Sequence, residues 1–234
     1  MVKNVQQYLK AIYQTADCSD FRSLMEFPQM LWLFYQVRYH TMIDIPRLKS
    51  LYRITKEVDS LKLSGDIIEC GVFCGGSAAV MAYATIDSSV ERDIWLFDSF
   101  EGLPKPTKED GQEALRQLRE GWNKGDIIKV KQIFEKKKIP KKRIHIVKGW
   151  FQETFSSIDI PRIAILHIDA DWYESVKLCL NKFYDSVEPG GYIVIDDYCY
   201  WEGARIATDE FIKNRGLKAA RKQADSTSYY LKKA

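Results

Sequence analysis

After Gly65, short apolar runs alternate with longer polar segments, and this alternation restricts the chain to one class of fold. Each run is as long as a strand and is bounded by charged or turn-forming residues, whereas the segments between the runs are long enough for helices. The expected strands are residues 66–70, 92–98, 143–147, 162–169 and 191–196. Strands separated by helices predict an α/β fold, with a mainly parallel sheet and helices on both faces.

The end of the chain breaks this alternation. The segments from Leu217 to Lys222 and from Ser226 to Leu231 flank a turn around Asp225, which predicts a hairpin. Added to the parallel strands, the hairpin completes a seven-stranded sheet. This arrangement matches the methyltransferase variant of the doubly wound fold better than the dehydrogenase variant, which would need a second mononucleotide-binding half.

The expected domain organisation is an N-terminal helical extension, residues 1–62, followed by one α/β domain, residues 63–234. A chain of 234 residues is long enough for one large domain but short for two. A helix is expected after Pro46, since proline favours the first helical turn. Helices of the extension would cap the site or form a dimer face, or they would only cover the sheet. Thr41 and Met42, just before that helix, could reach a bound cofactor.

A glycine-rich turn follows the first expected strand. The stretch from Gly65 to Ser77 reads GDIIECGVFCGGS and places Gly71, Gly75 and Gly76 before a helical run. Glycine lets the backbone approach a ligand closely, and a helix start offers free N–H groups. The turn therefore predicts a nucleotide-type site.

Asp98 ends the second expected strand, 27 positions after Gly71. In sheets of this class, an acidic residue at that place holds the two ribose hydroxyls of an adenosine. The alternative is an ordinary strand–turn–helix unit in which the aspartate is only solvated.

Pairs of aspartates end two later strands: Asp169 and Asp171, then Asp196 and Asp197. Ligands of open α/β sheets bind at the carboxyl ends of the strands, so these side chains should meet there. Their repulsion, on the order of 1 to 4 kcal/mol per close pair, calls for a cation. Carboxylate oxygens suit Mg²⁺, and the predicted ligands are Asp169, Asp196 and Asp197.

Asp171 is left as a general base that takes the proton of a hydroxyl group. N-capping of the helices that follow would explain Asp171 and Asp197, but it does not explain all four aspartates. His167 lies inside the strand and is expected to be a hydrogen-bonded core residue rather than a catalytic one.

The connection formed by residues 105–142 is longer than a strand-to-helix link needs, which predicts a lid or a substrate loop. Within it, residues 129–143 contain eight Lys or Arg in fifteen positions. This run would be either a patch for RNA or phosphate or a solvated helix face. The solvated face is favoured, because no RGG-like or interleaved aromatic context supports nucleic acid.

Composition excludes several other classes of protein. A net charge of +3 does not by itself indicate a nucleic-acid or membrane partner. No apolar run approaches the roughly 20 residues that span a bilayer, and the first residues lack the apolar core of a secretory signal. The five cysteines include no CxxC pair and no zinc-site spacing. We therefore expect a cytoplasmic protein with reduced thiols.

Taken together, these stretches resemble the macrocin O-methyltransferase (TylF-type) family of Mg²⁺- and S-adenosylmethionine-dependent sugar O-methyltransferases. The matching pieces are GDIIECGVFCGGSA at 65–78, LFDSFEGLP at 96–104, KGWFQETF at 148–155, LHIDADWYESVK at 166–177 and GGYIVIDDYCYWEGARIATDEF at 190–211. The stretch ECGVFCGGS is also similar to that of catechol O-methyltransferase. The resemblance implies a Rossmann-like class I methyltransferase fold.

The resemblance also implies roles for residues. Those implied to bind S-adenosylmethionine are Glu69, Gly71, Ser77, Asp98, Ser99, Gly149, Trp150 and Asp169. Mg²⁺ would be held by Asp169, Asp196 and Asp197. Asp171 would be the base in place of the lysine used by catechol-type enzymes. Cys74 departs from the family, whose loop usually carries a basic or polar residue there. The implied acceptor is a hydroxyl of a deoxysugar attached to an antibiotic, and the implied assembly is a homodimer, with neither nucleic acid nor membrane as partner.

Two rival functions remain at this point. A metal-dependent glycosyltransferase would use Asp169-Ala170-Asp171 as a DxD motif, but it leaves the glycine turn and Asp98 without a role. A nucleic-acid methyltransferase would use the basic run at 129–143.

Overall fold

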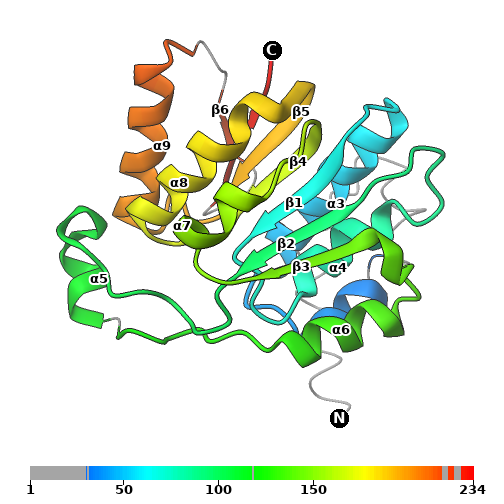
Figure 1. Cartoon of the computed structure of the whole chain (residues 1–234), viewed down its shortest axis with the longest axis horizontal. Coiled ribbons are helices and arrows are strands. Elements are labelled where there is room, and N and C mark those ends of the chain that lie inside the picture. Colours follow the sequence, from blue (N-terminus) through cyan, green and yellow to red (C-terminus); the bar gives the residue numbers. More distant parts are fainter. Residues whose placement is uncertain (1–29, 31, 118, 218–220, 224–227) are drawn as a thin grey trace.

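The computed structural model describes residues 30, 32–117, 119–217, 221–223 and 228–234. Its centre is one seven-stranded sheet with the strand order β3-β2-β1-β4-β5-β7-β6 (Figure 1). The strands are β1 (Asp66–Cys70), β2 (Ile94–Asp98), β3 (Ile144–Lys148), β4 (Ile163–Ile168), β5 (Val187–Ile195), β6 (Arg221–Gln223) and β7 (Tyr229–Lys232). Strands β1 to β5 pair in parallel, whereas β7 runs antiparallel to both β5 and β6. The expected sheet and its C-terminal hairpin are confirmed.

Strand β5 begins at Val187, four residues before the start that the sequence predicts. The segment 189–191 reads Pro-Gly-Gly, which normally signals a turn. The expected start of the strand was therefore placed too late in the chain. In the structure, the pairing of β4 with β5 shifts register between Ile163 and Ile165, so the strand continues through an irregularity.

Helices cover both faces of the sheet (Figure 1). They are α3 (Ile45–Ser60), α4 (Gly76–Ala84), α5 (Gly111–Gln117), α6 (Ile127–Lys136), α7 (Phe151–Thr154), α8 (Tyr173–Phe183) and α9 (Glu202–Asn214). Successive strand side chains point to opposite faces and so supply two hydrophobic cores. Ile67 packs in the core with α3, α4 and α6, and its neighbour Ile68 packs in the core with α8 and α9.

The N-terminal part of the chain packs directly on the first of these cores. Asp44 caps α3, with its side chain accepting a hydrogen bond from the backbone N–H of Arg47, and Pro46 lies in the first turn as expected. Residues 32–37 are helical, and Leu33 and Phe34 are buried in the same core. The expected extension therefore covers the sheet where it is described; its residues 1–29 lie outside the described ranges.

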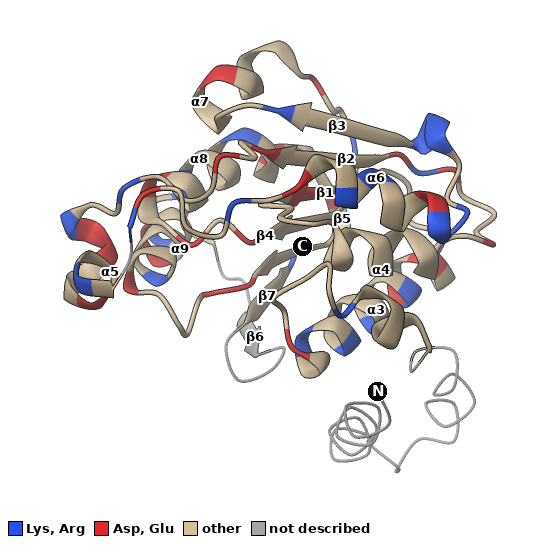
Figure 2. Ribbon diagram, turned by 90° about the horizontal axis from the view of Figure 1, so that it is seen from below, with Lys and Arg blue, Asp and Glu red and all other residues tan. Residues whose placement is uncertain are grey.

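The connection 105–142 contains two different structures. Its first half carries the short helix η1 (Lys108–Asp110) and α5, which lie at the α9 end of the molecule. Its second half is α6, whose Val130, Ile133 and Phe134 are buried against the first core. The expected solvated helix face accounts for three of the eight basic residues, since Lys129, Lys131 and Lys136 are exposed on α6. Lys137 is buried at the end of α6, and the last three basic residues form the short helix η2 (Lys141–Arg143). Figure 2 shows Lys and Arg spread over several elements, including α3, α5 and the ends of β3.

Within the described ranges, no helix is both long and apolar enough to cross a membrane. In the part of the chain that the structure describes, Cys70, Cys74, Cys179 and Cys199 form no disulfide. Cys18 lies outside the described residues.

Candidate active site

A cavity of about 440 Å³ opens at the carboxyl ends of the parallel strands. The strand order reverses between β1 and β4, which is where sheets of this type hold their ligands. The predicted residues that line the cavity are Gly71, Ser77, Asp98, Ser99, Gly149, Trp150, Asp169, Asp171, Asp196 and Asp197. The structure thus brings together every predicted site residue except Glu69. Thr41 and Met42 also line the cavity.

The glycine turn is tightly packed against the end of β4. Gly71 has a φ of +88°, and a Cβ atom added there would lie 1.7 Å from the carbonyl oxygen of Asp169. Gly75 adopts the left-handed conformation at the N-cap of α4. The N–H of Gly76 donates to the carbonyl of His40 at 2.8 Å, which ties the loop carrying Thr41 to the start of the helix. Glycine is therefore required here for backbone close approach.

The carboxylate of Asp98 braces the glycine turn. One oxygen, Oδ2, accepts the N–H groups of Val72 and Phe73 at 2.7 and 2.9 Å. The other, Oδ1, accepts the N–H of Phe100 at 2.6 Å. Asp98 lines the cavity and is half-buried, so its predicted contact with a ribose stays a prediction beside this bracing role.

Glu69 is turned away from the cavity. It is directly opposite His167 in the pairing of β1 with β4, and its Oε1 lies 2.8 Å from Nδ1 of His167, with both side chains fully buried. The register of the two strands therefore directs Glu69 into the protein interior. Glu69 is not among the residues that line the cavity, and its predicted place at the methionine end of the cofactor stays a prediction.

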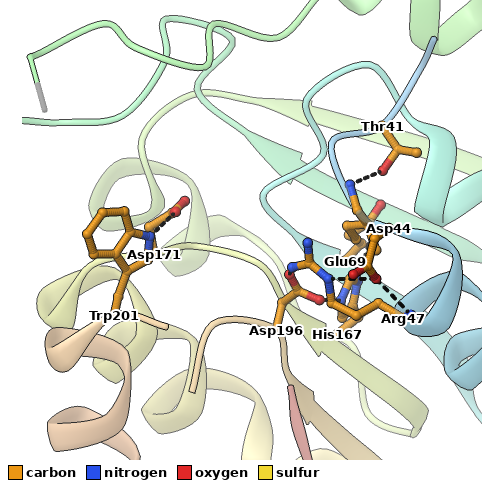
Figure 3. A network of polar contacts seen from close by, with 9 residues as sticks. Thr41, Asp44, Arg47, Glu69, His167, Asp171, Asp196 and Trp201 are labelled. Carbon is orange, nitrogen blue, oxygen red and sulfur yellow. Dashed lines mark hydrogen bonds and ion pairs between the residues drawn. The ribbon is translucent and has the colours of Figure 1, made fainter. Parts of the chain in front are cut away.

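Figure 3 shows that this buried pair continues into a network. Nε2 of His167 lies 3.8 Å from Oδ1 of Asp196, whose Oδ2 pairs with the guanidinium of Arg47. Burial alone would lower the pKa of His167, but the carboxylates of Asp196 and Glu69 outweigh it and raise the pKa to about 10. His167 is thus a paired core histidine, as the sequence predicts.

The remaining aspartates form a compact group of oxygens. One oxygen each of Asp169, Asp171 and Asp197 lies within 4.8 Å of the others. Burial, and then the neighbouring carboxylates, raise the pKa of both Asp169 and Asp197 well above the usual range. An all-oxygen set of this kind, held at a cost in charge repulsion, fits a divalent cation such as Mg²⁺. The group shares Asp169 and Asp197 with the predicted ligands but has Asp171 in place of Asp196.

Asp171 lies in the loop between β4 and α8, next to tryptophans of the second core. It has a φ of +55°, and its Oδ1 accepts the indole Nε1–H of Trp201 at 3.0 Å. Burial raises the pKa of Asp171 to about 7, against the lowering effect of the Trp201 hydrogen bond. Helix α8 begins with Trp172 as its N-cap and has no side-chain capping bond. The capping explanation therefore does not apply to Asp171.

The sequence pattern did not identify three residues that line the cavity, Arg47, Asp110 and Trp201. Arg47 follows a helix-start signature, but nothing local shows that it faces Asp196, 149 positions away. Asp110 lies in the connection 105–142, and its Oδ1 accepts the N–H of Tyr173 at 2.7 Å. Trp201 belongs to a stretch that carries the family resemblance, which is the one signal that could have indicated a role for it.

Comparisons with known proteins place this geometry in context. The family described as Macrocin-O-methyltransferase (TylF) matches residues 36–233. The demethyldecarbamoylnovobiocin O-methyltransferase of Streptomyces niveus is 30% identical over 177 residues, which cover 74% of this chain and 67% of the relative. The mycinamicin III 3''-O-methyltransferase of Micromonospora griseorubida is 28% identical over 207 residues, covering 86% and 81%.

Among solved structures, the O-methyltransferase NovP superposes with a TM-score of 0.76 at 27% identity and covers 83% of this chain and 82% of its own. The calicheamicin methyltransferase CalS11 has a TM-score of 0.66 at 21% identity, covering 99% of this chain and 91% of its own. The likeness to CalS11 shows the fold alone, and together with the likeness to NovP it confirms the class I methyltransferase fold.

Proposed function

The chain belongs to the macrocin O-methyltransferase (TylF) family, and from this premise we propose that it methylates a sugar hydroxyl of a glycosylated small molecule. As a member it is an O-methyltransferase whose methyl donor is S-adenosylmethionine. The observation that carries the proposal is a cavity that is lined both by the glycine turn and by a cluster of aspartates. The names of the relatives support the acceptor class, since those reported above name demethyldecarbamoylnovobiocin and the 3''-oxygen of mycinamicin III. A third relative, from Streptomyces olivaceus and 28% identical over 208 residues, is named for the 4'-oxygen of a rhamnosyl-tetracenomycin.

The cofactor would lie along the ends of β1, β2 and β3. Gly71 and Ser77 line the cavity beside the start of α4, Asp98 lies at the end of β2, and Gly149 and Trp150 lie after β3. Acidic side chains outnumber basic ones in the lining, which suits a positively charged sulfonium. Bound there, S-adenosylmethionine supplies an activated methyl group and a good leaving group. The protein's task is then to align the reactants and to remove a proton.

We assign the cation to Asp169, Asp196 and Asp197, and we keep Asp171 as the base. Mg²⁺ would supply charge stabilisation for the hydroxyl oxygen as it loses its proton. Arg47 already compensates part of the charge on Asp196, so the guanidinium and the cation would share this carboxylate. The competing set is Asp169, Asp171 and Asp197, whose oxygens are closest together in this structure.

Asp171 would take the proton of the acceptor hydroxyl while the oxygen forms its bond to the methyl carbon and the carbon–sulfur bond breaks. A pKa of about 7 suits a base that works near neutral pH. The cavity walls supplied by Trp172 and Trp201 would limit the access of water to this carboxylate.

A panel of glycosides tests the proposed reaction. The purified protein, S-adenosylmethionine and Mg²⁺ should increase the mass of a glycoside by one methyl group, and the corresponding aglycone should be inert. Methylation of the aglycone alone would contradict the sugar as acceptor.

The metal and base assignments are tested by comparing Asp171→Asn with Asp196→Asn. We expect Asp171→Asn to lower turnover by about 100- to 10,000-fold, the usual contribution of a general base, while the calorimetric affinities for Mg²⁺ and for S-adenosylmethionine stay near those of the wild type. Asp196→Asn should weaken Mg²⁺ binding by about tenfold or more, since even the loss of a residue supporting a ligand has such effects. Weakened Mg²⁺ binding in Asp171→Asn with normal binding in Asp196→Asn would favour the competing set. Turnover that does not change when EDTA is added would show that the reaction needs no cation.

The homodimer that the family resemblance implies and the cytoplasmic location expected from the sequence remain predictions. Light scattering of the purified protein tests the first, and cell fractionation of the native host tests the second. The family membership leaves no observation that favours the glycosyltransferase or the nucleic-acid methyltransferase.

A further inference from the structure

The geometry points to Trp201 as the positioning residue of the catalytic base: its indole N–H holds the carboxylate of Asp171 in the orientation that receives the proton. This inference rests on the proposed function, because it assigns Trp201 a role through Asp171. The two residues come from different elements, Asp171 from the loop between β4 and α8 and Trp201 from the N-cap of α9. Figure 3 shows the indole of Trp201 directed at the carboxylate, with the bond at 3.0 Å.

Asp171 needs an external partner to keep its orientation. Its backbone has a φ of +55°, a left-handed conformation that is uncommon for residues other than glycine, and Asp171 lies in a loop rather than in a helix or strand. The carboxylates of Asp169 and Asp197 lie nearby and repel it. A hydrogen bond from a neutral donor opposes this repulsion without adding a charge.

The indole N–H is suited to this task because it is a donor only. It occupies Oδ1 of Asp171 and leaves Oδ2 available for an acceptor hydroxyl. Since the indole cannot accept a proton, it does not compete with Asp171 for the proton that the reaction releases.

Trp201 is itself held in place on several sides. Its side chain is buried, and its ring makes an edge-to-face contact with Trp172 at a centroid distance of 5.3 Å. Tyr200 contacts it edge-to-face at 4.8 Å. Its backbone N–H donates to the carbonyl of Asp197 at 2.9 Å, which links the indole to the same loop as the proposed cation ligands. A donor fixed in this way adds little reorganisation cost when the acceptor binds.

The chain contains a matched control. Trp95 on β2 donates its indole N–H to Oδ2 of Asp66, also at 3.0 Å, at the opposite end of the sheet from the cavity. A change of Trp to Phe removes the same kind of hydrogen bond at either position. The two variants therefore separate a loss of stability from a loss of catalytic positioning.

The experiment compares Trp201→Phe with Trp95→Phe in full-length protein with S-adenosylmethionine, Mg²⁺ and an unmethylated glycoside that the panel identifies as an acceptor. We expect kcat of Trp201→Phe to fall by about 10- to 100-fold, the range associated with a small misplacement of a reacting group. The KM for the acceptor and the Kd for S-adenosylmethionine should change by less than about twofold. Trp95→Phe should also lower Tm, because it loses the same kind of hydrogen bond, and it should leave kcat unchanged.

A double-mutant cycle completes the test. In an Asp171→Asn background, Trp201→Phe should cause no further loss of the residual turnover, because the indole acts through the carboxylate. An equal loss in both backgrounds, an unchanged kcat in the single variant, or a parallel loss in Trp95→Phe would overturn the inference. Full turnover by Asp171→Asn alone would instead refute the proposed base, so the two failures are distinguishable.

Discussion

Asp98 braces the glycine turn, and a substitution there can distinguish a structural role of this carboxylate from a role in binding S-adenosylmethionine. The change Asp98→Asn keeps the size of the side chain but replaces one acceptor oxygen with an NH₂ group, which can only donate. The best orientation of the amide keeps its oxygen on the N–H groups of Val72 and Phe73. The NH₂ group then faces the N–H of Phe100, whose 2.6 Å hydrogen bond is lost.

The size of the effect follows from the lost bond. A hydrogen bond to a charged acceptor contributes about 1.5 to 3 kcal/mol, and since Asp98 is half-buried, water recovers part of this. We expect a decrease of about 1 to 2 kcal/mol in the free energy of unfolding. For a chain of this size, each kcal/mol corresponds to about 2 to 4 °C, so Tm should fall by about 2 to 8 °C.

The assay is thermal unfolding followed by fluorescence or calorimetry, in the absence of S-adenosylmethionine. Asp87→Asn, at an exposed position, is the control for the change of charge and should leave Tm nearly unchanged. If Asp98 served only to hold the ribose, Asp98→Asn would lose cofactor affinity without any change in the Tm of the ligand-free protein. That result would refute the bracing argument.

Further predictions follow from other close contacts. Gly71→Ala should destabilise the fold by more than about 3 kcal/mol or prevent soluble expression, because its Cβ would overlap the carbonyl of Asp169; chemical denaturation of any soluble product measures this. Burial lowers the pKa of Lys137 to about 8 from 10.5, so between those pH values the unfolded chain binds more protons than the folded one. Stability should therefore rise with pH across this window, and urea denaturation of Lys137→Met should lack that rise. Asp110→Ala should cost about 1 to 3 kcal/mol, because the N–H of Tyr173 loses its acceptor, and limited trypsin digestion should then cut residues 105–117 faster than in the wild type.

Features that depend on local pattern could be predicted from the sequence. The apolar runs predicted the parallel strands, and the glycine turn followed by Asp98 predicted the position of the cavity. Asp169 and Asp197 were predicted to meet because parallel strands end at the same edge of a sheet, and they do.

Features that depend on register and distant contacts could not be predicted. The side of the sheet to which Glu69 points depends on its pairing with His167, 98 positions later. The pairing of Arg47 with Asp196 depends on how α3 crosses the end of β5, and no local pattern encodes that crossing. The indole of Trp201 reaches Asp171 only because α9 begins beside the loop after β4. In each case the sequence shows the residue type, whereas the partner is decided by packing.

The division of the interior into two cores has a consequence for how the enzyme can diversify. The helix behind the glycine turn belongs to the first core, whereas Trp172 and Trp201, which surround the base, belong to the second. Substitutions that reshape this aromatic wall are thus separated by the full thickness of the sheet from the packing that holds α4 behind the glycine turn. The surroundings of Asp171 can therefore change while the support of the glycine turn stays the same.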